Sequence, residues 1–431
     1  MTPSCPPIAC WLAAGAGAAG RPEALERSVG KRLRSLLRFA CRQSPYYRAL
    51  FDRLQLDWRA FRGPEDLVRL PVLDKATLMA QMPELLASPS RGARFARRTT
   101  GTTGIPLQLP VTGLERWFDL YAWQRVYRRA GLGLRDRQLK MIIPAGPFPE
   151  HRVSSALGLF PRAYLSTLEP AAKKVSFIKR LAPRAIFGHA SFLGEVALEL
   201  ERRGERLLIP RIFSTSDMLW PGLRQRIEER LGGEVFDVYG AVETGPVAWE
   251  CREHDGFHVH SGLVIVEIVD DDGHPAPQGR VVCTVLWRRA VPLIRYALGD
   301  WAEWAKDACP CGDARPRLAA LHGREHELLR LPDGEWVSAS NLVSALLGIP
   351  GIRQFQVVQE TERQIAYRLV TAPDYPAWGD QRLVAQFQAR FMDRLNPVVA
   401  HVKQIEQVPG AKFTPFISLR RSRAAGEGPP L

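Results

Sequence analysis

The sequence predicts an α/β protein built around a parallel sheet, followed by a smaller α+β region. Short apolar runs that suit buried strands, Leu139–Pro144 and Ala185–Phe187, are separated by stretches of helical spacing, and this alternation is typical of parallel sheets covered by helices. With 431 residues and 46% hydrophobic composition, the chain can bury a large core and is expected to form two domains. From about Glu325 the pattern changes to two strands, a helix and a last strand.

The large domain is expected to begin with helices. Leu25–Leu50 spaces its apolar residues as on an amphipathic helix, which is expected to end at Ser44-Pro45. Trp58–Met82 suggests short helices around a turn at Leu70-Pro71. Leu114–Ala130 predicts another helix, and its leucine and aromatic residues offer a wide face that suits packing in the core.

The strand Ala185–Phe187 is expected to end in a candidate binding loop. Gly188–Phe192 closes this strand and begins the next helix. Open α/β sheets bind ligands at the carboxyl ends of their strands, so His189 and Ser191 are candidate pocket residues. A hydrogen-bonding role at the start of the helix explains the histidine equally well.

Two further strands, Arg211–Phe213 and Val235–Val238, flank a predicted helix at Pro221–Leu231. Ser214–Asp217 follows the first strand and suits the cap of that helix. Tyr239–Glu243 follows the second strand, and its glutamate offers a hard oxygen ligand for Mg²⁺. A carboxylate at a helix N-terminus is also favoured by the helix dipole, and the two roles are compatible.

A β-hairpin is predicted from Leu263–Val269 and Arg280–Trp287, around the turn-forming stretch Asp270–Gly279. Both strands are nearly continuous runs of β-branched residues, so we expect this sheet to be covered on both faces. The chain leaves the hairpin through Arg295–Asp300.

The stretch Arg98–Pro110, RTTGTTGIPLQLP, combines two glycines with four threonines. Glycine permits tight turns, and backbone N–H groups and threonine hydroxyls can then converge on one anion. The stretch lacks the Gly-Lys-Ser/Thr end of a Walker loop and the GxGxxG fingerprint. It therefore predicts a phosphate-binding loop of another kind, with an ordinary turn as the alternative.

Cysteine and histidine residues flank the hairpin. Cys251, His254, His258 and His260 precede it, and Cys309-Pro-Cys311-Gly312 follows it. We predict a structural zinc site of Cys₃His type from Cys251, His258, Cys309 and Cys311, in which His254 or His260 could substitute for His258. Free buried cysteines and surface histidines are the alternative. The odd total of seven cysteines suits reduced thiols or a metal site better than a disulfide framework.

The net charge of +14 comes from arginines spread along the chain rather than gathered beside stacking aromatic residues. A nucleic-acid-binding protein is therefore not expected, whereas ATP, coenzyme A or an acidic carrier protein suits a basic surface. Arginine-rich coding from a GC-rich genome is the alternative origin of this charge. The sequence has no run apolar enough for a membrane span, and residues 1–20 lack the basic start of a signal peptide. We expect a cytoplasmic monomer or homodimer.

Several motifs occur in a fixed order: the threonine- and glycine-rich loop, Tyr239–Glu243, Arg295–Asp300, Gly323-Arg324 and Ala411-Lys412-Phe413. Together they resemble the nucleotide-site motifs of the adenylate-forming superfamily of acyl-CoA synthetases and adenylation domains. Three smaller stretches, Ser44–Arg48, Leu70–Lys75 and Cys309–Gly312, resemble its phenylacetate-CoA ligase-like branch, which includes capsule-locus adenylating proteins. The resemblance runs from about Arg42 to Ser418.

The resemblance implies a large adenylate-forming domain of several subdomains, residues 1–324, and a small mobile α+β lid, residues 325–431. It also implies that the helix Leu114–Ala130 lies near the acyl pocket. The nucleotide-binding residues that it implies are Thr99, Thr100, Gly101, Thr102, Thr103, Gly104, Ser214, Thr215, Ser216, Tyr239, Gly240, Glu243, Asp300 and Arg324.

By this resemblance, the threonine loop holds the β- and γ-phosphates, and Ser214–Ser216 and Tyr239 enclose the adenine. Asp300 and Arg324 bind the ribose. The implied catalytic residues are Thr102 of the loop, Glu243 as the Mg²⁺ ligand, and Lys412 of the lid, whose charge suits the reacting carboxylate and phosphoryl oxygens.

The sequence therefore predicts an AMP-forming acid–thiol ligase that uses ATP and Mg²⁺, with coenzyme A as the expected acceptor and an aryl or arylacetic acid as the expected donor. Transfer to a carrier protein or an amine is the alternative within this class. Ile105 replaces a common family lysine, and His326 stands where acidic residues usually surround the hinge. These departures favour a second alternative, a non-catalytic nucleotide-binding homologue.

Overall fold

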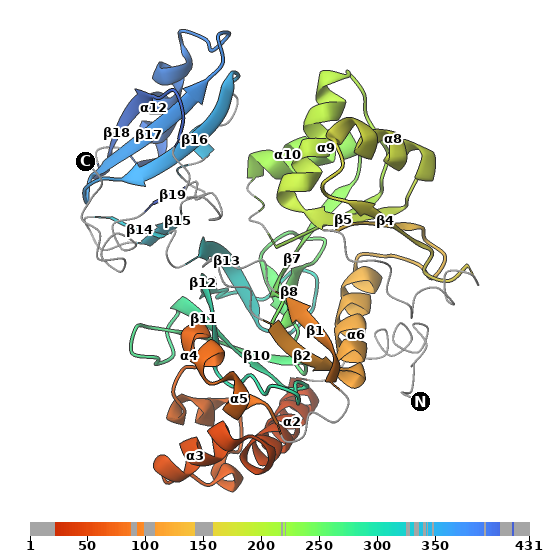
Figure 1. Ribbon diagram of the computed structural model, residues 1–431, viewed down its shortest axis with the longest axis vertical. Coiled ribbons are helices and arrows are strands. Elements are labelled where there is room, and N and C mark those ends of the chain that lie inside the picture. Colours follow the sequence, from red (N-terminus) through yellow and green to blue (C-terminus); the bar gives the residue numbers. More distant parts are fainter. Residues whose placement is uncertain are drawn as a thin grey trace. The chain divides into compact units, whose positions relative to one another are not determined.

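The computed structural model describes residues 22–87, 93–98, 108–142, 158–216, 219, 221–324, 328–331, 336–338, 342, 344–346, 349–391, 394–405 and 416–417. These residues form two compact units (Figure 1). The larger unit runs to Leu298 and includes Glu303–Ala320, and the smaller unit comprises Gly299–Ala302 and residues from Leu321 onward. The α/β class predicted from the sequence is confirmed, and the domain boundary after residue 324 stays a prediction.

The larger unit begins with helices. They are α2 (Pro22–Gln43), α3 (Pro45–Arg53), η2 (Trp58–Ala60), η3 (Pro64–Arg69), α4 (Lys75–Ala80) and α5 (Met82–Leu85). Ser44 has extended backbone angles and separates α2 from α3, because Pro45 has no N–H to continue α2 but suits the first position of a new helix. The Tyr47 hydroxyl of α3 donates to the Pro292 carbonyl oxygen at 3.0 Å and accepts from the Ile294 N–H at 3.2 Å.

Eleven strands form one sheet in the order β10-β11-β12-β13-β9-β8-β7-β6-β5-β3-β4. Neighbours from β4 to β7 are parallel, and β7-β8, β8-β9, β9-β13 and β10-β11 are antiparallel pairs. The predicted hairpin of β10 and β11 is thereby confirmed. The strands are β3 (Gln138–Ile142), β4 (Arg162–Ser166), β5 (Ala185–His189), β6 (Arg211–Thr215), β7 (Glu234–Ala241), β8 (Gly245–Glu250), β9 (Phe257–Val259), β10 (Val264–Val269), β11 (Gln278–Val285), β12 (Tyr296–Trp304) and β13 (Arg317–Arg324).

Helices cover both faces of the parallel part of this sheet. One core is formed by α8 (Ala171–Leu181), α9 (Ala190–Arg202) and α10 (Pro221–Leu231) against side chains such as Val235 (Figure 1). The other is formed by α6 (Gly113–Arg129) against Phe236 and Trp249. Successive strand residues point to opposite faces, so Val235 and Phe236 of β7 belong to different cores.

The residues that helix α6 buries differ from those of its predicted apolar face. Leu114 is exposed, whereas Glu115, Asp119 and Gln124 are buried. Thr112 and Glu115 form a reciprocal capping box at its start, with N–H to oxygen distances of 3.2 and 2.6 Å. Glu115 also accepts from the backbone N–H groups of residues 289 and 290, which explains why the helix buries this charge.

The smaller unit contains a four-stranded sheet in the order β18-β17-β16-β19 and a hairpin of β14 and β15. Leu383, Phe387 and Phe391 of α12 are buried against this sheet, as their spacing predicts. The sequence also predicts the two central strands, whereas β19 and the β14-β15 hairpin were missed. The elements are β14 (Leu328–Arg330), β15 (Trp336–Ser338), η5 (Ser344–Leu346), β16 (Ile352–Gln359), β17 (Gln364–Thr371), α12 (Gly379–Phe391), β18 (Asn396–His401) and β19 (Phe416–Ile417).

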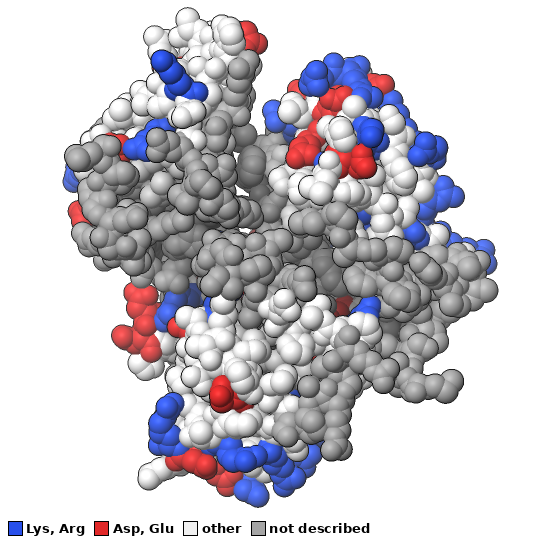
Figure 2. All heavy atoms as spheres, viewed as in Figure 1, with Lys and Arg blue, Asp and Glu red and all other residues white. Residues whose placement is uncertain are grey.

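Basic side chains on the helical side of the larger unit are mixed with acidic ones. Figure 2 shows Lys and Arg interleaved with Asp and Glu over α8, α9 and α10. Glu201 of α9, for example, lies 3.4 Å from Arg226 and 3.7 Å from Arg230 of α10. None of the helices in the described ranges combines the length and the apolar character needed to cross a bilayer.

Arg295 joins the N-terminal helical segment to the sheet. Its side chain is 2% exposed and lies 3.1 Å from a carboxylate oxygen of Glu267. The same guanidinium donates to the carbonyl oxygens of Leu70 and Gly273 at 2.5 and 2.7 Å. A planar, multiply donating group suits such a site, because it serves one carboxylate oxygen and several carbonyl oxygens at once. This residue opens the Arg295–Asp300 motif, and its observed contacts are structural.

We expect Arg295→Met to lower the free energy of unfolding by about 3–5 kcal/mol, because it leaves the Glu267 charge and two carbonyl groups buried without their donor. Arg59→Met is the control, since Arg59 pairs with Asp57 in an exposed ion pair and should change stability by less than about 0.5 kcal/mol. Urea unfolding followed by circular dichroism measures both. Equal midpoints for the two variants would contradict the role given to Arg295.

Candidate active site

The carboxyl ends of β5, β6 and β7 bring several predicted residues to one edge of the sheet. In the strand register His189 lies beside Thr215, and Thr215 lies beside Val238, the residue before Tyr239. The Thr215 hydroxyl donates to the Val238 carbonyl oxygen at 3.0 Å. Ser216 has a φ of 72°, an uncommon left-handed conformation that is enriched at functional sites. Residues 214–216 and Tyr239 therefore lie side by side.

The turn from β7 into β8 holds Glu243. Gly240 must lack a side chain here, because a Cβ atom would lie 2.3 Å from the Gly245 carbonyl oxygen. Glu243 is 7% exposed, and its Oε1 accepts from the Tyr296 hydroxyl at 3.2 Å. Arg288 donates to the Glu243 carbonyl oxygen at 3.1 Å. These contacts fix the carboxylate, which still has lone pairs for further ligands.

Asp300 and Arg324 are brought together within the smaller unit. Arg324 Nε lies 3.2 Å from Asp300 Oδ1, and Asp300 is the less exposed of the two side chains. Gly299, the residue before Asp300, has a φ of 75°, which glycine adopts without strain. The structure thus pairs two residues that are separated by more than twenty positions in the sequence.

Other predicted site residues lie outside the described residues. They are Thr99, Thr100, Gly101, Thr102, Thr103 and Gly104 of the threonine loop, Ile105, Asp217, His326 and Lys412. The described strands on either side of the loop, β1 (Ala93–Arg98) and β2 (Gln108–Thr112), form an antiparallel pair in which Arg98 lies opposite Gln108. The threonine loop therefore connects the two strands of a hairpin, of which β1 was missed from the sequence.

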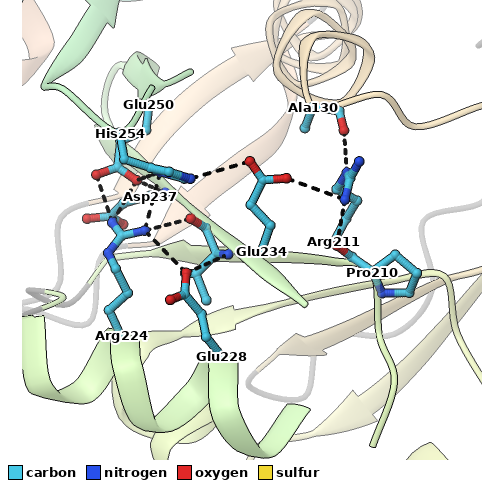
Figure 3. Close-up of polar contacts among 10 residues, drawn as sticks. Ala130, Pro210, Arg211, Arg224, Glu228, Glu234, Asp237, Glu250 and His254 are labelled. Atoms are coloured by element: carbon cyan, nitrogen blue, oxygen red, sulfur yellow. Dashed lines mark hydrogen bonds and ion pairs between the residues drawn. The ribbon is translucent and has the colours of Figure 1, made fainter. Parts of the chain in front are cut away.

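A partly buried ionic network lies beneath the strand ends (Figure 3). Arg224 of α10 donates to both oxygens of Glu250 at 2.8 and 2.7 Å, and Glu250 also accepts from the Asp237 N–H at 2.9 Å. His254 lies 3.4 Å from Glu250 and from Glu234. The network ties α10 to β7 and β8, and Asp237 is the cross-strand neighbour of Ser214.

The network shifts the pKa values of its members. Burial, helped by the negative charge of Glu250, raises the pKa of Asp237 to about 7. Burial also acts to raise the pKa of Glu250, but hydrogen bonds from His254 and Arg224 hold it below its usual value. The hydrogen bond to Glu250 raises the pKa of His254. A proton is therefore retained at Asp237 while Glu250 stays ionised.

The four predicted metal-binding residues come together in the larger unit. The side-chain ligand atoms of Cys251, His258, Cys309 and Cys311 all lie within 4.8 Å of one another. The alternative ligands lie elsewhere: His254 belongs to the ionic network, and His260 is fully buried against Trp249, with ring centroids 4.2 Å apart.

Sequence reasoning missed Glu115, Arg224, Asp237 and Glu250 as residues that support the site. The capping box at Thr112 and Glu115 follows a known four-residue pattern and could have been found. The ionic network has no comparable signal, because its members come from α10, β7 and β8 and meet only in the folded chain.

The chain is similar to known ligases. It is 30% identical to a phenylacetate-coenzyme A ligase of Thermus thermophilus over 364 residues, 79% of each protein, and 28% identical to that of Escherichia coli over 327 residues, 69% of this chain and 71% of the relative. Protein-family models give no match.

Solved ligases share the fold. The structure of 2-hydroxyisobutyryl-CoA ligase in the postadenylation state, bound to R3-HIB-AMP, has a TM-score of 0.75 at 20% identity and covers 92% of this chain and 90% of its own. An anthranilate CoA ligase bound to anthranoyl-AMP has a TM-score of 0.58 at 16% identity, covering 77% of this chain and 66% of its own.

We expect the raised pKa of Asp237, about 7 against an ordinary 3.8, to make stability depend on pH. Between these values the folded protein keeps a proton that the unfolded chain has released, so the free energy of unfolding falls as the pH rises and levels off above about pH 7. From pH 5 to pH 7 the free energy of unfolding of the wild type should fall by about 2 kcal/mol more than that of Asp237→Asn, at 1.36 kcal/mol per pKa unit.

Urea-unfolding midpoints at several pH values test this, with the exposed Asp52 changed to Asn as the control. Asparagine at position 237 keeps an acceptor for the Val238 N–H, which lies 3.1 Å from the aspartate. Parallel pH profiles for the wild type and Asp237→Asn would show that Asp237 is ionised throughout this range.

Proposed function

The chain belongs to the phenylacetate-CoA ligase family of AMP-forming acid–thiol ligases, and we propose that it activates an aryl or arylacetic acid and transfers it to coenzyme A. The coarser activity, ATP-dependent formation of an acyl-adenylate followed by transfer to coenzyme A, follows from the family. Phenylacetate is the substrate that the names of the relatives give. For this chain we propose the wider substrate class, an aryl or arylacetic acid.

The observation that carries the proposal is the meeting of residues 214–216, Tyr239 and Glu243 at the carboxyl ends of neighbouring strands. Ligands bind at this edge in open α/β sheets. In the proposed arrangement, residues 214–216 and Tyr239 enclose the adenine, and the Asp300 carboxylate accepts hydrogen bonds from the ribose, supported by Arg324.

Mg²⁺ fits Glu243. A carboxylate is the kind of hard oxygen ligand that this ion prefers, together with phosphate oxygens of the substrate. The contact with Tyr296 holds the Glu243 side chain in a nearly buried position, so few conformations are lost when a cation binds. Bound there, Mg²⁺ would neutralise charge on the phosphates.

The proposed reaction has two steps. A carboxylate oxygen of the acid attacks the α-phosphorus of ATP, the bond from phosphorus to the bridging oxygen breaks, and pyrophosphate leaves. The thiol sulfur of coenzyme A then attacks the carbonyl carbon of the acyl-adenylate and AMP leaves, while the thiol proton passes to solvent. Thr102 and its loop are proposed to hold the β- and γ-phosphates, and Lys412 to stabilise charge on the reacting oxygens.

The proposed cofactors are ATP, Mg²⁺ and coenzyme A, with Zn²⁺ as a structural component outside the reaction. A carrier-protein thiol or an amine is the alternative acceptor. Location in the cytoplasm and assembly as a monomer or homodimer stay predictions from the sequence.

The first test is acid-dependent exchange of labelled pyrophosphate into ATP over a panel of aryl, arylacetic and fatty acids. We expect exchange with the aryl or arylacetic class, and a rate about 10²–10³-fold lower in Glu243→Gln, because the metal ligand is lost at the centre where charge develops. Glu229→Gln, an exposed carboxylate on α10, is the matched control and should keep the wild-type rate. Lys412→Ala tests the lid residue in the same assay.

Three outcomes would change the proposal. Exchange with fatty acids alone would replace the substrate class. Exchange without thioester formation when coenzyme A is added would favour a carrier protein or an amine as acceptor. Folded protein that binds ATP but exchanges no pyrophosphate with any acid would favour a non-catalytic homologue.

A further inference from the structure

A cluster of three thiols and one imidazole lies apart from the proposed nucleotide site. Its members are Cys251, which directly follows β8, His258 in β9, and Cys309 and Cys311 in the connection between β12 and β13. Three separate segments of the chain therefore contribute to one group. His258 and Cys309 are buried, Cys251 is half-buried and Cys311 is exposed, so the cluster reaches from the interior of the larger unit to its surface.

The spacing of the side-chain atoms suits one tetrahedral ion. Zn–S bonds of about 2.3 Å and Zn–N bonds of about 2.0 Å place neighbouring sulfur atoms about 3.8 Å apart and sulfur about 3.5 Å from nitrogen in a tetrahedron. Cys251 Sγ lies 3.6 Å from Cys309 Sγ, and Cys311 Sγ lies 3.3 Å from His258 Nε2. Both distances match this geometry.

The backbone is shaped to present the two thiols of the Cys309–Gly312 turn on the same side. The Gly312 N–H donates to the Cys309 carbonyl oxygen at 3.1 Å, and Gly312 has a φ of 75°, which favours glycine. A tight turn closed by glycine is how a Cys-x-Cys knuckle brings both sulfur atoms to one ion. The other two members of the cluster follow a fixed strand pair. In the β8-β9 pairing Glu250 lies opposite Phe257, and these two residues directly precede Cys251 and His258.

The charges around the cluster suit an anionic site. Zn²⁺ with three thiolates and a neutral imidazole carries a net charge of −1. Arg317 is the cross-strand neighbour of His258 and interacts electrostatically with Cys309. Arg129 and Arg315 also act on His258, and Asp313 lies 3.4 and 2.5 Å from these two guanidinium groups. Arg317 also pairs with Asp255. Three cations therefore face two carboxylates here, and a thiolate-bound metal of net charge −1 would offset the excess.

We propose that Cys251, His258, Cys309 and Cys311 bind one structural Zn²⁺ ion that clips the end of β8 and strand β9 to the β12-β13 connection. Four protein ligands fill the coordination sphere of Zn²⁺, so no position is left for substrate, as in structural rather than catalytic zinc sites. The site is independent of the proposed ligase reaction.

The test measures zinc in the full-length protein, purified without a metal-affinity step, by plasma mass spectrometry. We expect about one zinc ion per chain in the wild type, and at least a tenfold lower content in Cys309→Ser and in Cys311→Ser. Cys41→Ser is the matched control, because Cys41 is a free cysteine of α2 outside the cluster, and it should keep the full content.

Cobalt substitution of the wild-type protein tests the site even if a serine variant fails to fold. Wild-type protein reconstituted with Co²⁺ should show the strong visible bands of a tetrahedral ion and thiolate-to-cobalt charge transfer. Folded wild-type protein that takes up neither zinc nor cobalt would overturn the proposal. A Cys251–Cys309 disulfide in the purified, metal-free protein, or zinc retained by a folded Cys309→Ser variant, would also overturn it.

Discussion

The ion pair between Arg224 and Glu250 is the contact on which the proposed nucleotide site depends. Two hydrogen bonds of 2.8 and 2.7 Å join helix α10 to the last residue of β8, and Glu250 also holds the backbone of β7 at Asp237. Buried ions are costly unless every hydrogen-bonding position is used. Here Glu250 is stabilised by the bidentate pair with Arg224, by His254 and by the Asp237 N–H. The strands β7 and β8, which flank Glu243, therefore keep one register.

Much of the fold was predictable because local pattern and tertiary structure agree. The strands β5, β6 and β7, the hairpin of β10 and β11, and the apolar face of α12 all follow from residue spacing. The break between α2 and α3 follows from one proline. The positions of residues 214–216 and Tyr239 were equally predictable, since parallel strands end at the same edge of the sheet.

What the sequence did not reveal depends on contacts between distant residues. Helix α6 buries Glu115 because the backbone N–H groups of residues 289 and 290 donate to its carboxylate, and no feature within Leu114–Ala130 predicts these partners. The predicted apolar face is therefore correct only in part: Trp123 packs against the core, whereas Leu114 is exposed. Short β1, β14, β15 and β19 were missed because strands of two to six residues carry too few positions for a periodic signal.

The register of β8 explains how the ionic network and the thiol cluster can both contact the end of this strand, each on its own face. Trp249 lies opposite His258, and Glu250 lies opposite Phe257. Paired residues in an antiparallel sheet point to the same face, and successive residues point to opposite faces. The ionic network of Glu250 therefore faces α10, while the thiol cluster that includes His258 shares the face of Trp249. Because β8 starts two residues after Glu243, fixing its far end from both faces restricts the strand that directly follows the proposed Mg²⁺ ligand.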